Sequence, residues 1–253
     1  MMRVWKTVAE WQSRRRVLEG RSIGFVPTMG ALHCGHASLV ERCRGENDIV
    51  VVSIFVNPSQ FNDPKDLDRY PCTLDADLDL LNRLGADEVI NPTADQLYPQ
   101  GYRFRLEPAA EDLVLEGAHR PGFFQGVLTI VLKLLNLVHA DRAYFGEKDF
   151  QQLNLVTAMA RDFFLPTEIV PCPTVREDSG LAMSSRNALL TPEGRAKAAC
   201  LHRALTTAPG AGCAEAALEA QGFQVDYVED RWGRRLAAAF LDGVRLIDNV
   251  PLP

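Results

Sequence analysis

The sequence predicts an α/β protein, with a Rossmann-like, doubly wound parallel sheet followed by a smaller C-terminal α+β domain. Short apolar runs typical of buried strands alternate with longer runs typical of helices up to about residue 173. The clearest strand is Asp48–Val56, whose sequence DIVVVSIFV is rich in β-branched residues. After residue 173 alanine-rich helix and short strands follow. We therefore expect one domain over residues 1–173 and a second over residues 174–253.

The elements expected in the first domain alternate in type along the chain, as a parallel sheet with crossover helices requires. Helical patterns occur at Val4–Leu18, Ala37–Arg44, Asp75–Leu84, Gly126–Val138 and Phe150–Phe163. Strand patterns occur at Ile23–Pro27, Asp48–Val56, Glu88–Asn91, Arg103–Glu107, Arg142–Phe145 and Glu168–Pro171.

The second domain is expected to begin with a helix over Thr191–Thr207. Thr191 suits the N-cap position of that helix and Pro192 its first turn. A glycine-containing loop at Pro209–Cys213 is expected next. Short strands near Gln224–Val228 and Arg245–Ile247 complete the predicted domain.

Composition points to a protein of the cytoplasm with no nucleic-acid or membrane partner. The 253 residues are 47% hydrophobic and 24% charged, and the net charge of -6 comes with no long basic run. The most apolar stretch, Val127–Val138, is interrupted by Lys133 and falls short of the roughly 20 residues of a membrane span. The first residues lack the apolar core of a signal peptide, and the six cysteines form no CxxC pair, so we expect reduced thiols.

The segment IGFVPTMGALHCGHASLV, residues 23–40, reads as strand, turn and helix, with His33 and His36 at or just before the helix start. A helix start offers unpaired N–H groups and the positive end of the helix dipole, which favour phosphate binding. Two imidazoles there could donate hydrogen bonds to a triphosphate as negative charge develops on it. Taken alone, the segment also fits two ordinary loop histidines or a metal pair, although zinc needs further ligands.

Three further segments follow expected strands or precede an expected helix. In GEKDFQQL, residues 146–153, Lys148 could reach a phosphate at the edge of the sheet, or form a surface pair with Asp149. In SGLAMSSRNALLTPEGR, residues 179–195, hydroxyls and a guanidinium could hold a pyrophosphate, or the segment could simply connect domains. In FVNPSQFN, residues 55–62, Asn57 and Gln60 could orient a hydroxy acid, or form a turn at Asn57-Pro58.

Taken together, PTMGALHCGH, FVNPSQF, YFGEKDFQQL and MSSRN resemble the pantothenate synthetase family of the HxGH nucleotidyl-transfer superfamily. The segments DLDRYPCTLDAD, LEGAHRPGFFQGV and RLIDN are similar to the same family, so the resemblance extends from about Pro27 to Asn249. It implies an ATP-dependent condensation of pantoate with β-alanine through a pantoyl adenylate, with release of AMP and pyrophosphate. It also implies Mg²⁺ as cofactor, small-molecule partners only, and a homodimer.

The resemblance also implies roles for individual residues. Catalytic roles fall to His33, His36, Lys148, Ser184, Ser185 and Arg186. ATP is expected to contact Pro27, Thr28, Met29, His33, His36, Gly146, Lys148, Asp149, Val175, Met183, Ser184, Ser185 and Arg186. Pantoate and β-alanine are expected to contact Met29, Asn57, Gln60 and Gln152. Asp75 and Asp77 are candidates for a metal contact, with a solvated helix start as the alternative.

The chain departs from the family pattern where RPGFF, residues 120–124, carries Phe123 in place of the usual histidine. The Ala188-Leu189-Leu190 run also lacks the aromatic residue that commonly follows SSRN, and the C-terminal part looks short. Two other functions remain open from the sequence. One is a different HxGH enzyme that makes a dinucleotide-like product, and the other is a nucleotide-binding module that has lost turnover.

Overall fold

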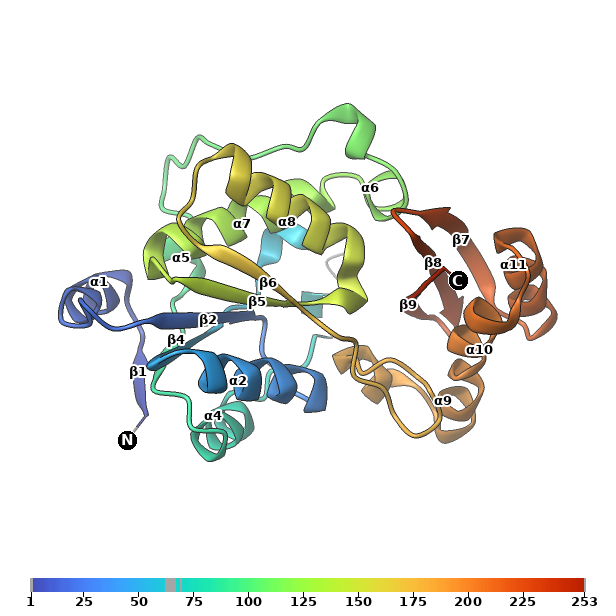
Figure 1. Cartoon of the computed structure of the whole chain (residues 1–253), viewed down its shortest axis with the longest axis horizontal. Coiled ribbons are helices and arrows are strands. Elements are labelled where there is room, and N and C mark those ends of the chain that lie inside the picture. The colour runs from blue at the N-terminus through green and yellow to red at the C-terminus, as the bar shows by residue number, and fades with distance from the viewer. Residues whose placement is uncertain (1, 62–66, 69, 253) are drawn as a thin grey trace.

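Six parallel strands form the larger sheet, in the order β1-β4-β3-β2-β5-β6 (Figure 1). The computed structural model describes residues 2–61, 67–68 and 70–252, so Asn62, Asp66 and Arg69 of the motifs above lie outside the described residues. The strands are β1 (Arg3–Trp5), β2 (Ile23–Thr28), β3 (Ile49–Ile54), β4 (Glu88–Ile90), β5 (Arg142–Gly146) and β6 (Glu168–Cys172). This arrangement, with helices on both faces, confirms the predicted fold class.

The side chains of the central strands pack in two separate cores, because successive residues of a strand point to opposite faces of the sheet. Phe25 and Val51 face one core, and Val26 and Val52 face the other. The first core lies against the helices α1 (Val8–Arg16), α5 (Ala94–Leu97), α7 (Phe123–Val138) and α8 (Phe150–Asp162). The second lies against α2 (Cys34–Glu46) and α4 (Leu74–Arg83). Burial on both faces explains why the strand sequences are almost continuously apolar.

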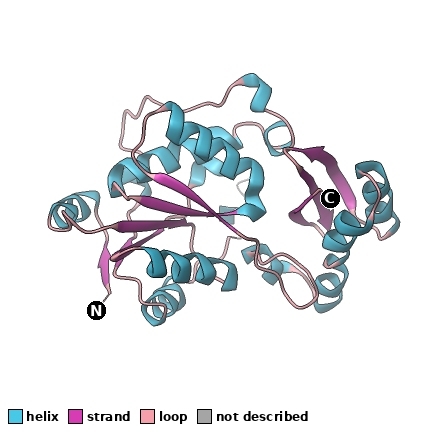
Figure 2. Ribbon diagram, in the orientation of Figure 1, coloured by secondary structure: helices cyan, strands magenta, loops and turns pink. Residues whose placement is uncertain are grey.

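A three-stranded antiparallel sheet forms the C-terminal part, beyond the carboxyl ends of the parallel strands (Figures 1 and 2). Its strands are β7 (Gln224–Arg231), β8 (Arg234–Leu241) and β9 (Val244–Pro251). It follows the helices α9 (Pro192–Ala198), α10 (Cys200–Thr207) and α11 (Ala211–Ala220), and α10 and α11 share its core. The predicted domain boundary lies directly after β6 and stays a prediction.

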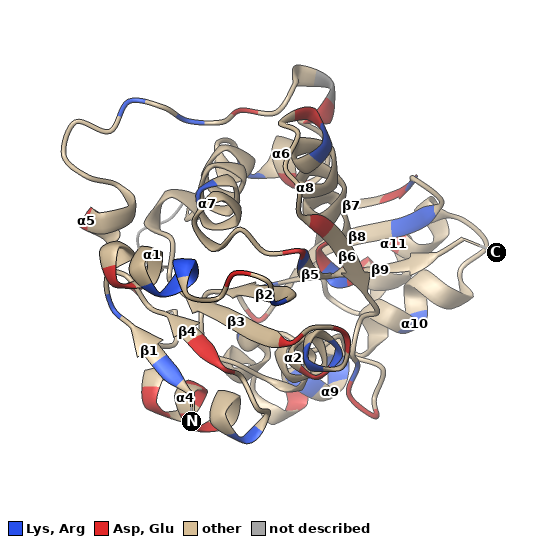
Figure 3. Cartoon of the chain, turned by 60° about the vertical axis from the view of Figure 1, so that its left-hand side comes forward, with Lys and Arg blue, Asp and Glu red and all other residues tan. Residues whose placement is uncertain are grey.

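Short helical segments connect these elements around the edge of the larger sheet. They are α6 (Glu116–His119) and the 3-10 helices η1 (Pro58–Gln60), η2 (Ala110–Asp112), η3 (Glu147–Asp149) and η4 (Ser185–Leu189). Basic and acidic residues are interspersed along the ribbon in Figure 3. Among the helices of the described ranges, none combines the length and apolar character that crossing a bilayer demands.

Two predicted elements near the edge of the first part were wrong. The helix expected over Val4–Leu18 begins only at Val8, because Arg3–Trp5 pairs with β4 and extends the parallel sheet. Thr7 caps the helix with a complete capping box, which fixes this later start. The strand expected at Arg103–Glu107 is irregular, and its alternation reflects only Leu106, which packs against the core while Phe104 is exposed.

The C-terminal part differs more from its prediction. The helix expected over Thr191–Thr207 is two helices, separated at Ala199, although Thr191 does cap the first as predicted. The loop expected at Pro209–Cys213 already contains the start of α11. The central strand β8 was missed because its sequence RRLAAAFL carries three alanines, which favour helices when considered alone.

Candidate active site

A cavity of about 730 Å³ lies between the larger sheet and the C-terminal part. It borders the carboxyl ends of β2 and β5, adjacent strands from which the sheet is built outward in opposite directions. Open α/β sheets form their ligand crevice at such a switch point. All residues predicted to bind ATP line this cavity, as do Asn57, Gln60 and Gln152.

The two histidines are fixed by the backbone at the start of α2. His33 is the N-cap residue, and its Nδ1 accepts a hydrogen bond from the Gly35 N–H at 3.1 Å. The Nδ1 of His36 accepts from the His33 N–H at 3.4 Å. A Cβ at position 35 would lie 2.9 Å from Cε1 of His33, so only glycine lets this ring fold back over the turn. With both Nδ1 atoms accepting, the neutral rings carry their proton on Nε2.

Both imidazoles are neutral at pH 7. Burial and the charge of Lys148 lower the pKa of His33 to about 4, against a smaller opposing effect of Asp149. Burial, His33 and Lys148 lower the pKa of His36 to about 3. The pair therefore offers two uncharged N–H donors, which stabilise a developing negative charge without themselves losing a proton.

These low pKa values predict that acid destabilises the fold through His36. In the unfolded chain this histidine takes up a proton as the pH falls below its ordinary value of 6.5, whereas the folded chain resists protonation until about pH 3. The free energy of unfolding should therefore fall between pH 6.5 and pH 3, with no contribution from this group above pH 6.5. Urea unfolding across this range should show a shallower decline in His36→Gln. His139→Asn, at an exposed helix end, is the control and should follow the unsubstituted chain.

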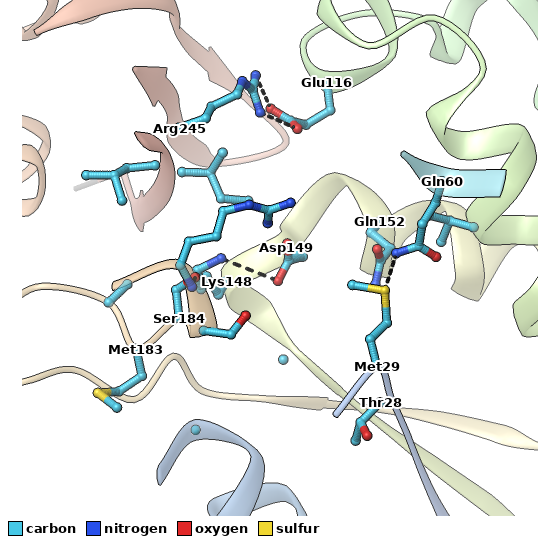
Figure 4. A pocket seen from close by; sticks show the side chains of 18 of the residues that line it. Thr28, Met29, Gln60, Glu116, Lys148, Asp149, Gln152, Met183, Ser184 and Arg245 are labelled. Atoms are coloured by element: carbon cyan, nitrogen blue, oxygen red, sulfur yellow. Dashed lines mark hydrogen bonds and ion pairs between the residues drawn. The ribbon is translucent and has the colours of Figure 1, made fainter. Parts of the chain in front are cut away.

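Lys148 enters the cavity from the turn η3, which connects β5 to α8. Its side chain is 18% exposed, and its Nζ lies 3.7 Å from the Asp149 carboxylate. Figure 4 shows this ion pair beside Ser184, which comes from a different segment of the chain. The adjacency of β2 and β5 thus places a cation next to the two neutral imidazoles.

The segment that follows β6 folds back on itself before it reaches Ser184. An isolated bridge joins Arg176 to Ala182, and the Met183 N–H donates to the Val175 carbonyl at 2.9 Å. The Ser184 Oγ then accepts from the Arg186 N–H at 3.2 Å, which caps η4. As a result Val175, Met183, Ser184, Ser185 and Arg186 all line the cavity.

Gln60 lies at the other end of the cavity and is held by Asn57. The Gln60 Nε2 contacts the Met29 Sδ at 2.8 Å, with Gln152 beside them (Figure 4). The Asn57 Nδ2 donates to the Gln60 Oε1 at 3.0 Å and to the Gly126 carbonyl at 3.2 Å. A Cβ on Gly126 would lie 2.3 Å from the Ser59 carbonyl oxygen, so glycine is required for this close approach. Asn57 therefore orients Gln60 from behind.

Asp75 and Asp77 do not line the cavity. Asp77 is buried, and its carboxylate accepts hydrogen bonds from the N–H groups of Ala31 and Leu32 at 2.9 and 2.8 Å. Asp75 is exposed on α4. Within the described ranges, no three His, Cys, Asp or Glu residues are grouped so as to hold a metal ion. Asp77 therefore holds the turn before His33, and the metal contact of Asp75 and Asp77 stays a prediction.

The protein-family model described as Pantoate-beta-alanine ligase matches residues 2–251. The chain belongs to this family. A pantothenate synthetase from Bdellovibrio bacteriovorus is 53% identical over 252 residues, which cover 100% of both chains. A solved pantothenate synthetase from Thermus thermophilus is 44% identical with a TM-score of 0.92, and the match covers 99% of each chain. A solved pantoate-beta-alanine ligase from Francisella tularensis, complexed with beta-gamma ATP and beta-alanine, is 41% identical with a TM-score of 0.95, covering 99% of this chain and 98% of that one.

Phe123, which replaces the usual family histidine, has a defined place in the structure. Phe123 is buried, and the Arg120 guanidinium lies 3.6 Å from the centre of its ring. Arg120 also donates to the Gln60 carbonyl at 3.3 Å. The aromatic ring therefore supports a cation at the cavity wall by a cation–π contact. The C-terminal part is not shortened relative to the Bdellovibrio family member, which aligns over its full length.

Several cavity residues were not assigned a role from the sequence. Tyr70 reaches the cavity, where its hydroxyl lies 3.5 Å from the Ser185 Oγ. Glu116 and Arg245 form a further wall, joined by a two-pronged ion pair that Figure 4 shows clearly. Glu116 lies in the family segment LEGAHRPGFFQGV, and Arg245 lies in the family segment RLIDN. These two motifs were therefore the sequence signal from which a role could have been assigned.

Proposed function

We propose that this chain condenses pantoate with β-alanine at the cost of ATP, forming pantothenate, AMP and pyrophosphate. The observation that carries this function is the convergence of His33, Lys148 and Arg186 on one cavity, together with the Met29–Gln60 contact. Family membership across nearly the whole chain supports the same reaction.

In the first step a carboxylate oxygen of pantoate attacks the α-phosphorus of ATP. The bond from that phosphorus to the bridging oxygen breaks, and pyrophosphate leaves with the electron pair. The Nε2–H groups of His33 and His36 donate to the phosphate oxygens, and the Lys148 ammonium offsets their charge. Ser184, Ser185 and Arg186 hold the departing pyrophosphate. Gln60, oriented by Asn57, and Gln152 hold pantoate in line for attack.

In the second step the amine of β-alanine attacks the acyl carbon of pantoyl adenylate, AMP leaves, and the amine loses a proton. The mixed anhydride must meanwhile be protected from water. The C-terminal part closes one side of the cavity, since residues of β9 such as Arg245 and Asp248 line it. Asn57 also helps to place β-alanine, since it lines the same end of the cavity as Gln60.

The cavity fits Mg²⁺ as a companion of the triphosphate. This ion keeps several waters and usually binds through phosphates and one or two carboxylates, and Asp149 supplies a carboxylate at the cavity wall. Bound there, it would neutralise phosphate charge. The proposal also includes a homodimer in the cytoplasm, as family membership implies.

The test is pyrophosphate release from ATP and Mg²⁺ with pantoate alone, followed by AMP release when β-alanine is added. A burst of pyrophosphate close to one per active site, and steady AMP formation only with β-alanine, is the expected result. A different HxGH enzyme would release no pyrophosphate with pantoate. A binding module without turnover would bind ATP and show neither product, and either outcome would overturn the proposed function.

A further inference from the structure

The late segment RLIDN lies on β9, and three of its side chains contact different walls of the cavity. Arg245 forms its ion pair with Glu116 of α6. Asp248 accepts two hydrogen bonds from Arg176, at 2.6 and 2.9 Å, in the segment that leads to Ser184. Asn249 contacts the turn that carries Lys148. One strand of the C-terminal part is therefore joined to three segments around the site.

Asn249 holds the backbone on both sides of Lys148. Its Nδ2 donates to the carbonyl oxygens of Glu147 and Lys148, each at 2.9 Å, and its side chain is buried with 2% exposure. These two carbonyls belong to the two peptide planes that meet at the Lys148 Cα. Because a peptide unit is planar, fixing both planes fixes the φ and ψ of Lys148.

The Asn249 amide is itself held in one orientation. Its Oδ1 accepts a hydrogen bond from the Arg234 Nε, which leaves the Nδ2 to face the two carbonyls. The Arg234 guanidinium lies 4.7 Å from the centre of the Phe150 ring and 3.4 Å from the Glu147 carboxylate. Side chains of β8 and β9 thus contact both the backbone of the η3 turn and its Glu147 side chain.

We propose that Asn249 is a positioning residue for Lys148, so that the phosphate-binding cation is aligned only when the C-terminal sheet is docked. This inference rests on the proposed function, because it concerns the lysine that neutralises the triphosphate. A residue that only joined two domains would affect stability. A positioning residue must instead affect the step in which Lys148 acts, and must do so through Lys148.

The sharpest variant is Asn249→Asp, which has nearly the same shape. It keeps an oxygen for Arg234 but replaces the donor to the Glu147 and Lys148 carbonyls by a second carboxylate oxygen. Losing two partly buried hydrogen bonds should slow single-turnover pyrophosphate release by about 10- to 100-fold. The KM for β-alanine should stay within about 2-fold, since Lys148 acts before that substrate reacts. Asn249→Ala, with its melting temperature measured alongside, replaces Asn249→Asp if the latter does not fold.

A double-mutant cycle with Lys148→Ala separates positioning from general stabilisation. If Asn249 acts through Lys148, then Asn249→Asp should change the pyrophosphate rate by less than about 2-fold when Lys148 is already alanine. If the pyrophosphate rate in Lys148→Ala falls below detection, the same double-mutant cycle can be measured with the dissociation constant of ATP in the presence of Mg²⁺. Asp230→Asn is the matched control, because it weakens an ion pair with Arg235 inside the same small sheet. Its effect should be equal in both backgrounds.

Equal losses from Asn249→Asp in both backgrounds would overturn the inference and leave Asn249 as a structural contact. A normal pyrophosphate rate in folded Asn249→Asp would overturn it as well. The unsubstituted chain in the same assay tests the proposed function separately. If that chain releases no pyrophosphate with pantoate, the proposed function fails, whereas an active chain with an unaffected variant contradicts only the role of Asn249.

Discussion

His36→Ala is expected to slow pyrophosphate release from ATP and pantoate by about 10²- to 10³-fold, the usual loss for one transition-state donor. The Nδ1 of His36 is engaged by the His33 N–H, so the Nε2–H is the group that the substitution removes from the cavity. Because burial and neighbouring charges lower the pKa of His36 to about 3, the loss should be constant between about pH 5 and pH 8. Rapid-quench measurement with excess enzyme reports this step directly.

His36→Gln is the informative companion, because a glutamine amide can place an N–H close to the position of the imidazole Nε2. It should recover part of the rate that His36→Ala loses. Near-normal pyrophosphate release in folded His36→Ala would contradict the catalytic assignment. Equal rates in the two variants would show that the hydrogen-bond donor at this position is unimportant.

The sequence was sufficient to predict the strands that border the central cavity and the functional side chains that follow them. β2 and β5 are apolar strands, each followed at once by a turn with a basic or imidazole side chain. Neighbouring parallel strands bring their carboxyl ends to one edge, so His33 and Lys148 had to converge once the two strands paired. The family motifs then supplied Ser184 and Gln60. These predictions rest on local patterns and one general rule of sheet topology.

The contacts of the C-terminal part could not be predicted in the same way. β8 was not predicted because Ala237, Ala238 and Ala239 favour a helix when considered alone, although they are buried in the middle strand of the sheet. Asn249 meets Lys148 across about a hundred residues of sequence, and only docking of the two parts brings them together. Similarly, the sequence could not show that the Asp77 carboxylate accepts hydrogen bonds from the Ala31 and Leu32 backbone, because the fold alone brings these residues together.

Glu116→Ala is expected to lower the free energy of unfolding by about 3–5 kcal/mol, the range found when one partner of a buried ion pair is removed. Glu116 is 6% exposed and accepts from Arg245 at 2.7 and 2.8 Å and from the Tyr227 hydroxyl at 2.8 Å. The substitution would leave the cations of Arg245 and Arg120 without this carboxylate at the cavity wall. Urea unfolding at pH 7 measures the loss.

The pH dependence of the free energy of unfolding should also report on the Glu116 carboxylate. Burial raises the pKa of Glu116, but the hydrogen bonds and charge of Arg245 outweigh burial and hold it below the ordinary value of 4.5. A carboxyl with a lowered pKa stabilises the fold above its unfolded-state value, and this contribution is lost as the pH falls below 4.5. The stability difference between Glu116→Ala and the unsubstituted chain should therefore narrow at acidic pH.

Glu116 belongs to α6 and bonds to Tyr227 and Arg245 of the C-terminal sheet, so the expected loss concerns the contact between these two elements. Arg245→Ala removes the other partner, and the double variant should lower the free energy of unfolding by less than the sum of the two single losses, because the Glu116–Arg245 pair can be lost only once. Arg245 keeps its ion pair with Asp226 in Glu116→Ala, and Glu116 keeps its ion pair with Arg120 in Arg245→Ala. Glu229→Ala is the matched control, since its ion pair with Arg231 has the same 2.7 Å separation but is 43% exposed at both side chains. Glu229→Ala should lower the free energy of unfolding by no more than about 1 kcal/mol. Additive losses at Glu116 and Arg245 would mean that the two residues stabilise the chain independently. The sheet that carries Asn249 would then have to be held over the cavity by its other contacts.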